Sequence, residues 1–322
     1  MFMEIQKAGL LDSFQDAGRT CMAGLGVGQG GWMDSLAAAL ANILAGNDRA
    51  EPVLEMHFPA PRLCFEQAVF IALSGADFGA SAYGVALPLN RRISLPAGSE
   101  IIFQKKINGQ RCYLAMAGGW ELPSVLNSAS TLLKSGLGGW QGRALKKNDK
   151  IPLKLKISTL IEQIKVSSFF LAPYMWYRAA PFHVFPGPEW DWLSAETKKQ
   201  IMETAFTITP SNDRMGYRLA GAQLEMVNKM EMKSSGVLAG TIQRLSNGQP
   251  LILMADAQTT GGYPRILQIA AVDFPRLAQL GTGDSLWFSF IKMETAVQLM
   301  ESQKQWLQQT EAGMRFQITG FS

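Results

Sequence analysis

Short apolar runs that end at glycine, proline or asparagine constrain the fold of this chain more than any other feature. The chain has 31 glycines and 15 prolines among 322 residues, so few stretches are long enough for an extended helix. In the region 53–115, for example, the apolar run 69–73 is soon followed by Gly75. Runs of this length between turn residues are typical of antiparallel strands. We therefore expect a mainly β protein with a few helices.

The length of the chain allows either one large core or two compact ones. Around 136–156 the composition becomes glycine-rich and then basic, which favours a change of subdomain near this point. We expect two linked halves, 1–160 and 161–322, with 157–164 as the connector.

Three helices are expected within the strand pattern. The first covers 34–45, because the Asp34 carboxylate can cap its first turn and Gly46 can end it. The others are expected over 194–206 and 293–309. The last helix carries an apolar stripe, expected to be core or dimer surface, that is formed by Ala296, Leu299, Met300 and Trp306.

Charge and cysteine content exclude several classes of protein. The net charge is only +4, and no lysine and arginine cluster has interleaved aromatics, so we expect no nucleic-acid or membrane partner. Cys21, Cys64 and Cys112 form no Cys-x-x-Cys pair, which argues against a disulfide framework and a structural zinc site. The first residues lack an apolar stretch of signal-peptide length, and no apolar run would span a bilayer. We expect a cytoplasmic protein without a metal site.

The segment 240–264 is the densest run of polar and conformationally permissive residues. It predicts a β-hairpin, because Asn247-Gly248 can supply two positive φ angles and 251–254 suits a buried strand. A polar cluster follows, where a rigid scaffold can hold side chains near a ligand. The alternative is an ordinary polar turn. The cluster comprises Asp256, Gln258, Thr259, Thr260, Gly261, Gly262 and Tyr263.

Acid/base chemistry in this cluster is expected from Asp256, with Asp16 or Asp34 as alternatives and Tyr263 as a hydroxyl donor. The paired glycines would let a small molecule approach the backbone closely. The chain has only two histidines, and neither has a nucleophile nearby in a recognisable local pattern. A Ser-His-Asp or Cys-His mechanism is therefore not expected.

Two arginines stand four residues apart, at Arg214 and Arg218. Guanidinium groups can hold a carboxylate or a phosphate in bidentate geometry, so the pair predicts an anion site. The alternative is an internal salt bridge to Asp213 or Glu225.

Three glutamines offer a paired donor and acceptor, at Gln15, Gln243 and Gln258. This pairing matches a lactam, a urea or the ureido ring of biotin, which all present N–H beside C=O. Alternatively, each glutamine satisfies backbone groups in the interior. The glycines of 26–31 fit a dinucleotide fingerprint only formally, because no βαβ pattern surrounds them, and no Walker A string occurs.

Four spaced motifs together resemble the biotin-dependent carboxyltransferase family. They are Gln-Asp-Ala-Gly-Arg at 15–19 and the strings at 33–47, 213–219 and 240–264. The family includes the KipA-like proteins, the protein historically called allophanate hydrolase subunit 2, the C subunit of bacterial 5-oxoprolinase and part of the carboxyltransferase region of urea carboxylase. The resemblance covers about 5–290, which would be one family domain.

The resemblance implies two cyclophilin-like β-barrel subdomains, 1–160 and 161–322. It also implies a hydrolase subunit that needs partner subunits for activity, in an ATP-dependent complex that cleaves 5-oxoproline to glutamate. The expected partner is a KipI-like subunit, with a LamB/YcsF-like subunit as a further candidate. ATP is expected at the level of the complex, and biotin, if used, only on a separate carrier protein.

Two other functions fit the resemblance. One is biotin-dependent carboxyl transfer to urea or a related amide. The other is a non-catalytic, KipA-like regulator that binds a kinase-inhibitor partner. The chain departs from the family at Ala129, where relatives usually have an arginine, so an anion contact made there by relatives is not expected here.

The resemblance and the side-chain chemistry together give a set of candidate site residues. Asp256 is expected to transfer protons, while Tyr263 and Thr260 polarise the substrate. Residues expected to bind the substrate are Gln243, Gln258, Arg214, Arg218, Gly261, Gly262, Gln15, Asp16 and Arg19.

Overall fold

The computed structural model describes residues 1–155, 160–227 and 232–319, which fold into two compact units. Unit 1 comprises Met1–Arg19, Gly30–Pro173 and Gln305–Ser322, and unit 2 comprises Thr20–Gln29 and Tyr174–Lys304. Residues 157–159 of the expected connector lie outside the described residues. The division of the family domain at 160/161 stays a prediction.

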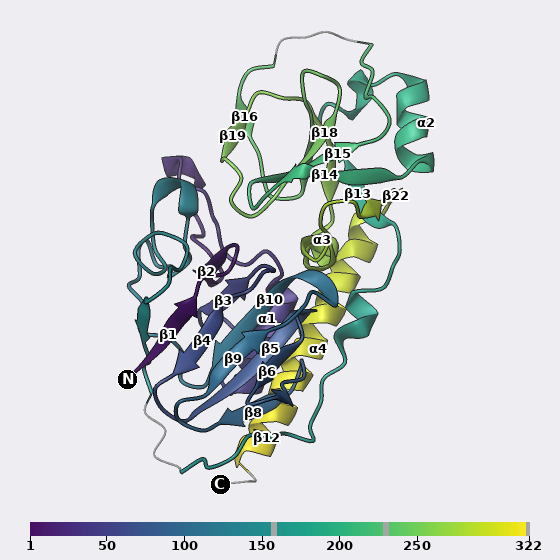
Figure 1. Ribbon diagram of the computed structural model, residues 1–322. Helices are drawn as coiled ribbons and strands as arrows, with labels where there is room; N and C mark the ends of the chain where they lie inside the picture. Colours follow the sequence, from purple (N-terminus) through teal and green to yellow (C-terminus); the bar gives the residue numbers. More distant parts are fainter. Residues whose placement is uncertain (156–159, 228–231, 320–322) are drawn as a thin grey trace. The chain divides into compact units, whose positions relative to one another are not determined.

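Unit 1 contains two six-stranded antiparallel sheets among its described residues (Figure 1). The first has the order β11-β1-β4-β9-β6-β7 and the second β12-β8-β5-β10-β3-β2. Ile5 and Leu63 from the first sheet and Ile71 and Leu114 from the second are fully buried in one apolar core. The strands are β1 (Phe2–Lys7), β2 (Asp12–Gln15), β3 (Val53–Met56), β4 (Arg62–Phe65), β5 (Val69–Asp77), β6 (Ala80–Ala82), β7 (Val85–Ala86), β8 (Arg92–Leu95), β9 (Glu100–Phe103), β10 (Asn108–Met116), β11 (Lys150–Pro152) and β12 (Lys165–Val166).

The helix α1 (Ser35–Ala45) packs against β5 and β10 of unit 1. It begins as predicted, because the Asp34 carboxylate accepts a hydrogen bond of 2.9 Å from the backbone N–H of Ala37. It ends at Gly46, whose φ of 85° is the left-handed conformation that closes a helix. Both predicted ends of this helix are confirmed.

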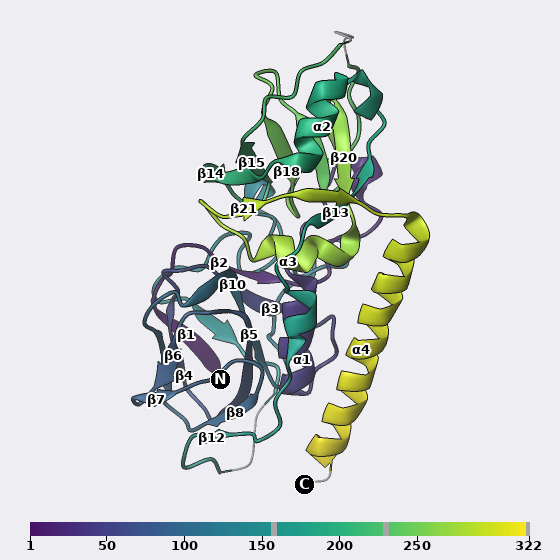
Figure 2. The same ribbon diagram turned by 90° about the vertical axis from the view of Figure 1, so that its right-hand side faces the viewer.

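Unit 2 is built on an eight-stranded sheet with the order β21-β14-β15-β18-β17-β20-β13-β22. Most of these strands are labelled in Figure 2, together with α2. The neighbouring strands are antiparallel except β13 and β22, and a separate ribbon pairs β16 with β19. The mainly β fold with barrel-like sheets is confirmed. The strands are β13 (Phe182–Pro186), β14 (Phe206–Asn212), β15 (Gly216–Ala220), β16 (Ser235–Gly236), β17 (Thr241–Arg244), β18 (Pro250–Leu253), β19 (Thr260–Gly261), β20 (Arg265–Ile269), β21 (Ser285–Leu286) and β22 (Phe288–Phe290).

The predicted hairpin is formed by β17 and β18, with Ile242 opposite Ile252. Its turn differs from the prediction, because only Gly248 has a positive φ, at 84°, and Asn247 does not. The loop is longer than a two-residue turn, since Gly248 N–H donates to the Leu245 carbonyl and Leu245 N–H donates to the Gln249 carbonyl. A longer hairpin loop needs a left-handed residue only at its end.

The remaining helices are α2 (Ala195–Glu203), α3 (Phe274–Ala278) and α4 (Met293–Thr319). The first of these is capped by the Ser194 hydroxyl, as its predicted start implies. The last runs beyond the predicted end at 309, to Thr319. Of the expected stripe on α4, Ala296 is buried and Leu299 and Trp306 are half-buried, whereas Met300 is 41% exposed. Its role as core or dimer surface stays a prediction. Short 3-10 turns occupy Ala23–Leu25, Leu133–Ser135, Pro173–Trp176, Trp190–Trp192 and Ala271–Asp273. Among the described residues, no helix is both long and apolar enough to cross a membrane.

Candidate functional site

A pocket of about 510 Å³ lies in unit 2, on one face of the strand pair β15 and β18. Arg218 and Leu251 lie opposite each other in this pair and line the pocket, whereas their neighbours Tyr217 and Ile252 are fully buried in the core. The two-residue period of a strand therefore gives this pair a core face and a pocket face. The pocket is lined by Pro210, Ser211, Asn212, Asp213, Met215, Gly216, Arg218, Leu251, Leu253 and Gln258.

Gly216 makes room for the apolar floor of the pocket. A β-carbon at this position would lie 2.8 Å from Leu251 Cδ1 and 3.1 Å from the Ile252 carbonyl oxygen. The carbonyl belongs to the strand ladder and cannot easily move, so a side chain here would displace the leucine. The absence of a side chain at Gly216 thus lets Leu251 and Leu253 form the floor together.

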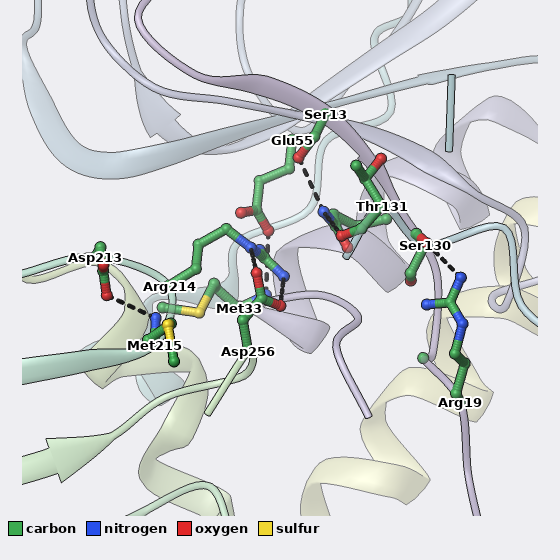
Figure 3. Close-up of polar contacts among 12 residues, drawn as sticks. Ser13, Arg19, Met33, Glu55, Ser130, Thr131, Asp213, Arg214, Met215 and Asp256 are labelled. Atoms are coloured by element: carbon green, nitrogen blue, oxygen red, sulfur yellow. Dashed lines mark hydrogen bonds and ion pairs between the residues drawn. The ribbon is translucent and has the colours of Figure 1, made fainter. Parts of the chain in front are cut away.

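The turn between β14 and β15 is held by Asp213. Its Oδ1 accepts hydrogen bonds from the backbone N–H groups of Met215 (2.7 Å) and Gly216 (3.1 Å), as Figure 3 shows for Met215. This is the local hydrogen bonding through which aspartate stabilises a tight turn. The predicted alternative of a salt bridge between Asp213 and a neighbouring arginine was wrong, because this carboxylate caps the turn.

Arg214 turns away from the pocket and forms an internal ion pair with Asp256. Its Nε donates to Oδ2 and its Nη2 donates to Oδ1, both at 2.8 Å (Figure 3). The two side chains are only 3% and 5% exposed. An internal salt bridge was one of the two predicted roles of this arginine, but the expected partners Asp213 and Glu225 were wrong. The joint anion clamp of Arg214 and Arg218 does not form, because only Arg218 reaches the pocket.

Arg218 and Gln258 bring two predicted binding residues into the same pocket. Both side chains are exposed. Within the part of the chain that the structure describes, no carboxylate pairs with Arg218 and no group hydrogen-bonds to the Gln258 amide. Among those residues, the pocket therefore combines one unpaired cation and one unpaired amide above an apolar floor.

The other predicted residues of the segment 240–264 do not line this pocket. Gln243 is fully buried, and its Nε2 donates to the Tyr263 carbonyl at 3.3 Å. A β-carbon at Gly261 would lie 2.7 Å from that Nε2, so the glycine accommodates a side chain of the protein instead of a ligand. Gly262, Thr260 and the Tyr263 ring are exposed.

In unit 1, the predicted residues Gln15, Asp16 and Arg19 hold the loop 128–131. The Asp16 carboxylate accepts four hydrogen bonds, from the hydroxyls of Ser128 and Ser130 and from the backbone N–H groups of Gly18 and Ala129. The distances are between 2.6 and 2.8 Å. A carboxylate with four internal donors is held in place as a structural group.

The neighbours of Asp16 serve the same loop. Arg19 donates to the Ser130 carbonyl at 2.8 Å (Figure 3). Gln15 donates to the Ser13 hydroxyl and to the Thr131 carbonyl. Arg19 and Gln15 are 1% and 0% exposed. Gln15 therefore satisfies a backbone group in the interior, which was the predicted alternative to ligand binding for the glutamines.

Several pocket residues were missed by the sequence analysis. The run 251–254 was interpreted as wholly buried, but Leu251 is half-buried and lines the pocket. The residues 210–212 at the end of β14 gave no chemical signal. A usable signal was the alternation of Gly216 and Arg218 around the apolar Tyr217, which marks two faces of one strand.

Comparison with known proteins gives consistent matches over most of the chain. The family model described as "Carboxyltransferase domain, subdomain A and B" matches residues 25–290. The chain is 34% identical over 307 residues to the C subunit of 5-oxoprolinase from Escherichia coli K12, covering 95% of this chain and 97% of that protein. The Haemophilus influenzae protein of the same name is 31% identical, covering 92% of this chain and 94% of that protein.

A solved structure also resembles this chain. The urea amidolyase of K. lactis superposes with a TM-score of 0.87 at 26% sequence identity, covering 96% of this chain. The match covers only 20% of that much longer chain. Almost the whole of this chain is therefore similar to one part of a larger enzyme.

Proposed function

Because this chain belongs to the carboxyltransferase domain family, we propose that it is a subunit of an ATP-dependent amide hydrolase complex that opens 5-oxoproline to glutamate. Support comes from two bacterial relatives that are named as the C subunit of 5-oxoprolinase and align with this chain over almost their full lengths. The word subunit in these names implies other chains, for which a KipI-like protein is our candidate, with a LamB/YcsF-like protein as a second.

One observation carries this proposal. The pocket holds two polar side chains, Arg218 and Gln258, that have no partners among the described residues. 5-Oxoproline bears a carboxylate beside a five-membered lactam. The Arg218 guanidinium can hold the carboxylate, and the Gln258 amide can donate to the lactam C=O and accept from its N–H. The ring methylenes would lie on Leu251 and Leu253.

Opening the lactam breaks its C–N bond, places the hydroxyl of a water on the carbonyl carbon and a proton on the nitrogen. ATP supplies the driving force in the complex, and this chain supplies binding and orientation. Gln258 would hold the lactam oxygen where negative charge develops during the attack. Asp256 was predicted to transfer protons, but both its oxygens already accept hydrogen bonds from Arg214. Roles for Thr260 and Tyr263 stay predictions.

The proposal is tested by reconstitution. The chain is co-purified with the KipI-like and LamB/YcsF-like proteins of its own genome, and glutamate release from L-5-oxoproline is measured with and without ATP. We expect release that requires ATP and every subunit. An assembled complex that hydrolyses ATP but releases no glutamate would contradict the proposal.

Carboxyl transfer to urea or a related amide is the second candidate, because the chain superposes closely on part of a urea amidolyase. In that case biotin would be carried by a separate protein. The two candidates separate in one experiment: ATP-dependent consumption of urea with a biotinylated carrier and bicarbonate, without glutamate release, would favour carboxyl transfer.

A further inference from the structure

We infer that the buried Arg214–Asp256 ion pair is a positioning device that holds Gln258 at the pocket. The inference rests on the proposed function, since it concerns the same pocket. It assigns Asp256 a role through its neighbour in place of a direct role in proton transfer.

The ion pair joins two segments that each contribute to the pocket lining. One is the turn that contains Asp213 and Met215, and the other is the chain after β18 that leads to Gln258. Neither Arg214 nor Asp256 lines the pocket itself. Arg214 stands between the lining residues Asp213 and Met215, and Asp256 stands two residues before the lining residue Gln258.

Backbone hydrogen bonds bring the same two segments together. Met254 N–H donates to the Met215 carbonyl at 3.0 Å, and Asp256 N–H donates to the Arg214 carbonyl at 2.8 Å. These bonds extend the pairing of β15 with β18 beyond the last ladder pair, Gly216 and Leu253. Gln258 itself has no hydrogen bond to the described residues. The backbone on either side of it is held, because Ala257 N–H donates to the Met254 carbonyl at 3.1 Å and Val237 N–H donates to the Thr259 carbonyl at 3.0 Å. The ion pair adds the side-chain contact that fixes the start of this short segment.

The geometry of the pair suits positioning better than stabilisation. A bidentate contact between a planar guanidinium and a carboxylate fixes both distance and angle. Its net contribution to folding is small, because removing two charges from water costs about as much as their attraction returns. Replacement of such a pair by apolar side chains of similar size is often neutral for stability. An ion pair that adds little stability but fixes distance and angle is suited to holding the residues between Asp256 and Gln258 in place.

The test measures the affinity of the full-length chain for L-5-oxoproline by titration calorimetry. We compare the unmodified chain with Asp256→Asn, Gln258→Ala and the double variant. If Asp256 acts through Gln258, Asp256→Asn weakens binding ~10-fold in the unmodified background and has almost no further effect when Gln258 is already alanine. An equal loss in both backgrounds would overturn the inference, since it would mean that the two residues act independently.

Two further variants separate positioning from folding. Arg214→Met/Asp256→Leu removes both buried charges, so it should keep the thermal midpoint within a few degrees and still bind the ligand ~10-fold more weakly. The matched control is Glu189→Gln, which weakens another bidentate pair in unit 2, with Arg265 (2.7 Å), whose members do not line the pocket. It should lower stability and leave affinity unchanged. A folded Arg214→Met/Asp256→Leu variant with unchanged affinity would contradict the inference.

Failure of the proposed substrate is distinguishable from failure of the positioning role. If the unmodified chain does not bind L-5-oxoproline, the proposed function is wrong in its substrate. Hydrogen exchange then decides the positioning role, because the Met254 and Asp256 amides should exchange faster in Arg214→Met/Asp256→Leu. Unchanged exchange at both amides would overturn it.

Discussion

The network around Asp16 in unit 1 and the segments 213–218 and 251–258 at the pocket in unit 2 contain the same types of side chain. Each has a carboxylate (Asp16 or Asp256), an arginine and a glutamine. In unit 1 these groups donate to and accept from a neighbouring loop, and the carboxylate has four donors. In unit 2 the carboxylate pairs with Arg214, while Arg218 and Gln258 are left to face the pocket. Residue type alone does not distinguish structural from binding groups. The presence of an internal partner does.

The largest effect is expected in unit 1, at a carboxylate that has fewer partners than Asp16. Burial raises the pKa of Asp12 to about 7 from 3.8, although a hydrogen bond from Gly9 N–H partly opposes this. The folded chain therefore keeps a proton that the unfolded chain loses. The free energy of unfolding should fall as pH rises from about 4 to about 7, by on the order of 4 kcal/mol, and change little above that.

Asp12→Asn removes this ionisation, so the slope between pH 4 and 7 should disappear in denaturant unfolding at several pH values. The unmodified chain measured in parallel is the reference. A slope of the same size in the variant would assign the pH dependence to other groups.

The second effect concerns the Asp16 network itself. Asp16→Ala leaves the hydroxyls and N–H groups around it without their acceptor, so the free energy of unfolding should fall by about 3 kcal/mol. The measurement is urea denaturation. Asp191→Ala, at an 89% exposed side chain, is the control and should change stability by less than about 0.5 kcal/mol. If Asp16→Ala were as stable as this control, the comparison between the two units would lose its basis.

The third effect is on binding in unit 2. Arg218→Met removes the guanidinium from the pocket, so we expect the affinity for L-5-oxoproline to fall ~10-fold or more with little change in stability. Titration calorimetry and thermal unfolding measure the two quantities. Arg62→Met, at a 46% exposed arginine of unit 1, should leave both nearly unchanged. A loss of stability without a loss of affinity would place Arg218 with the structural groups.

The smallest effect concerns the pocket floor. Gly216→Ala would place a methyl group against Leu251 and should shift that side chain, weakening binding ~3-fold and stability by about 1 kcal/mol. Gly236→Ala is the matched strand control, because a β-carbon there meets no atom of the described residues within 4 Å. If the two variants had the same affinity and the same stability, Leu251 would accommodate the added methyl group without a loss of either.

Local chemistry was predictable from the sequence where neighbouring residues decide it. The Asp34 cap and the Gly46 stop define α1 without help from the rest of the chain. The hairpin β17–β18 was predictable from Asn247-Gly248 and the apolar run 251–254, but its turn type was not, because the number of loop residues depends on where strand pairing stops.

Contacts between residues far apart in the sequence determine which arginine and which glutamine face the pocket, and local patterns could not predict these contacts. Arg214 and Arg218 are equivalent by type but differ in their contacts, because Asp256, which follows another strand, pairs with the first. Gln243 and Gln258 likewise differ by burial, because Gln243 lies within β17 and is fully buried, whereas Gln258 lies in the loop after β18 and is exposed.

The division of β15 and β18 into two faces also matters for engineering. Ligand choice would be encoded at alternating positions such as Arg218 and Leu251, while their sequence neighbours Tyr217 and Ile252 support the sheet. Libraries restricted to the former could explore new substrates without repacking the interior. The same arrangement would let natural variants diverge in specificity while keeping one scaffold.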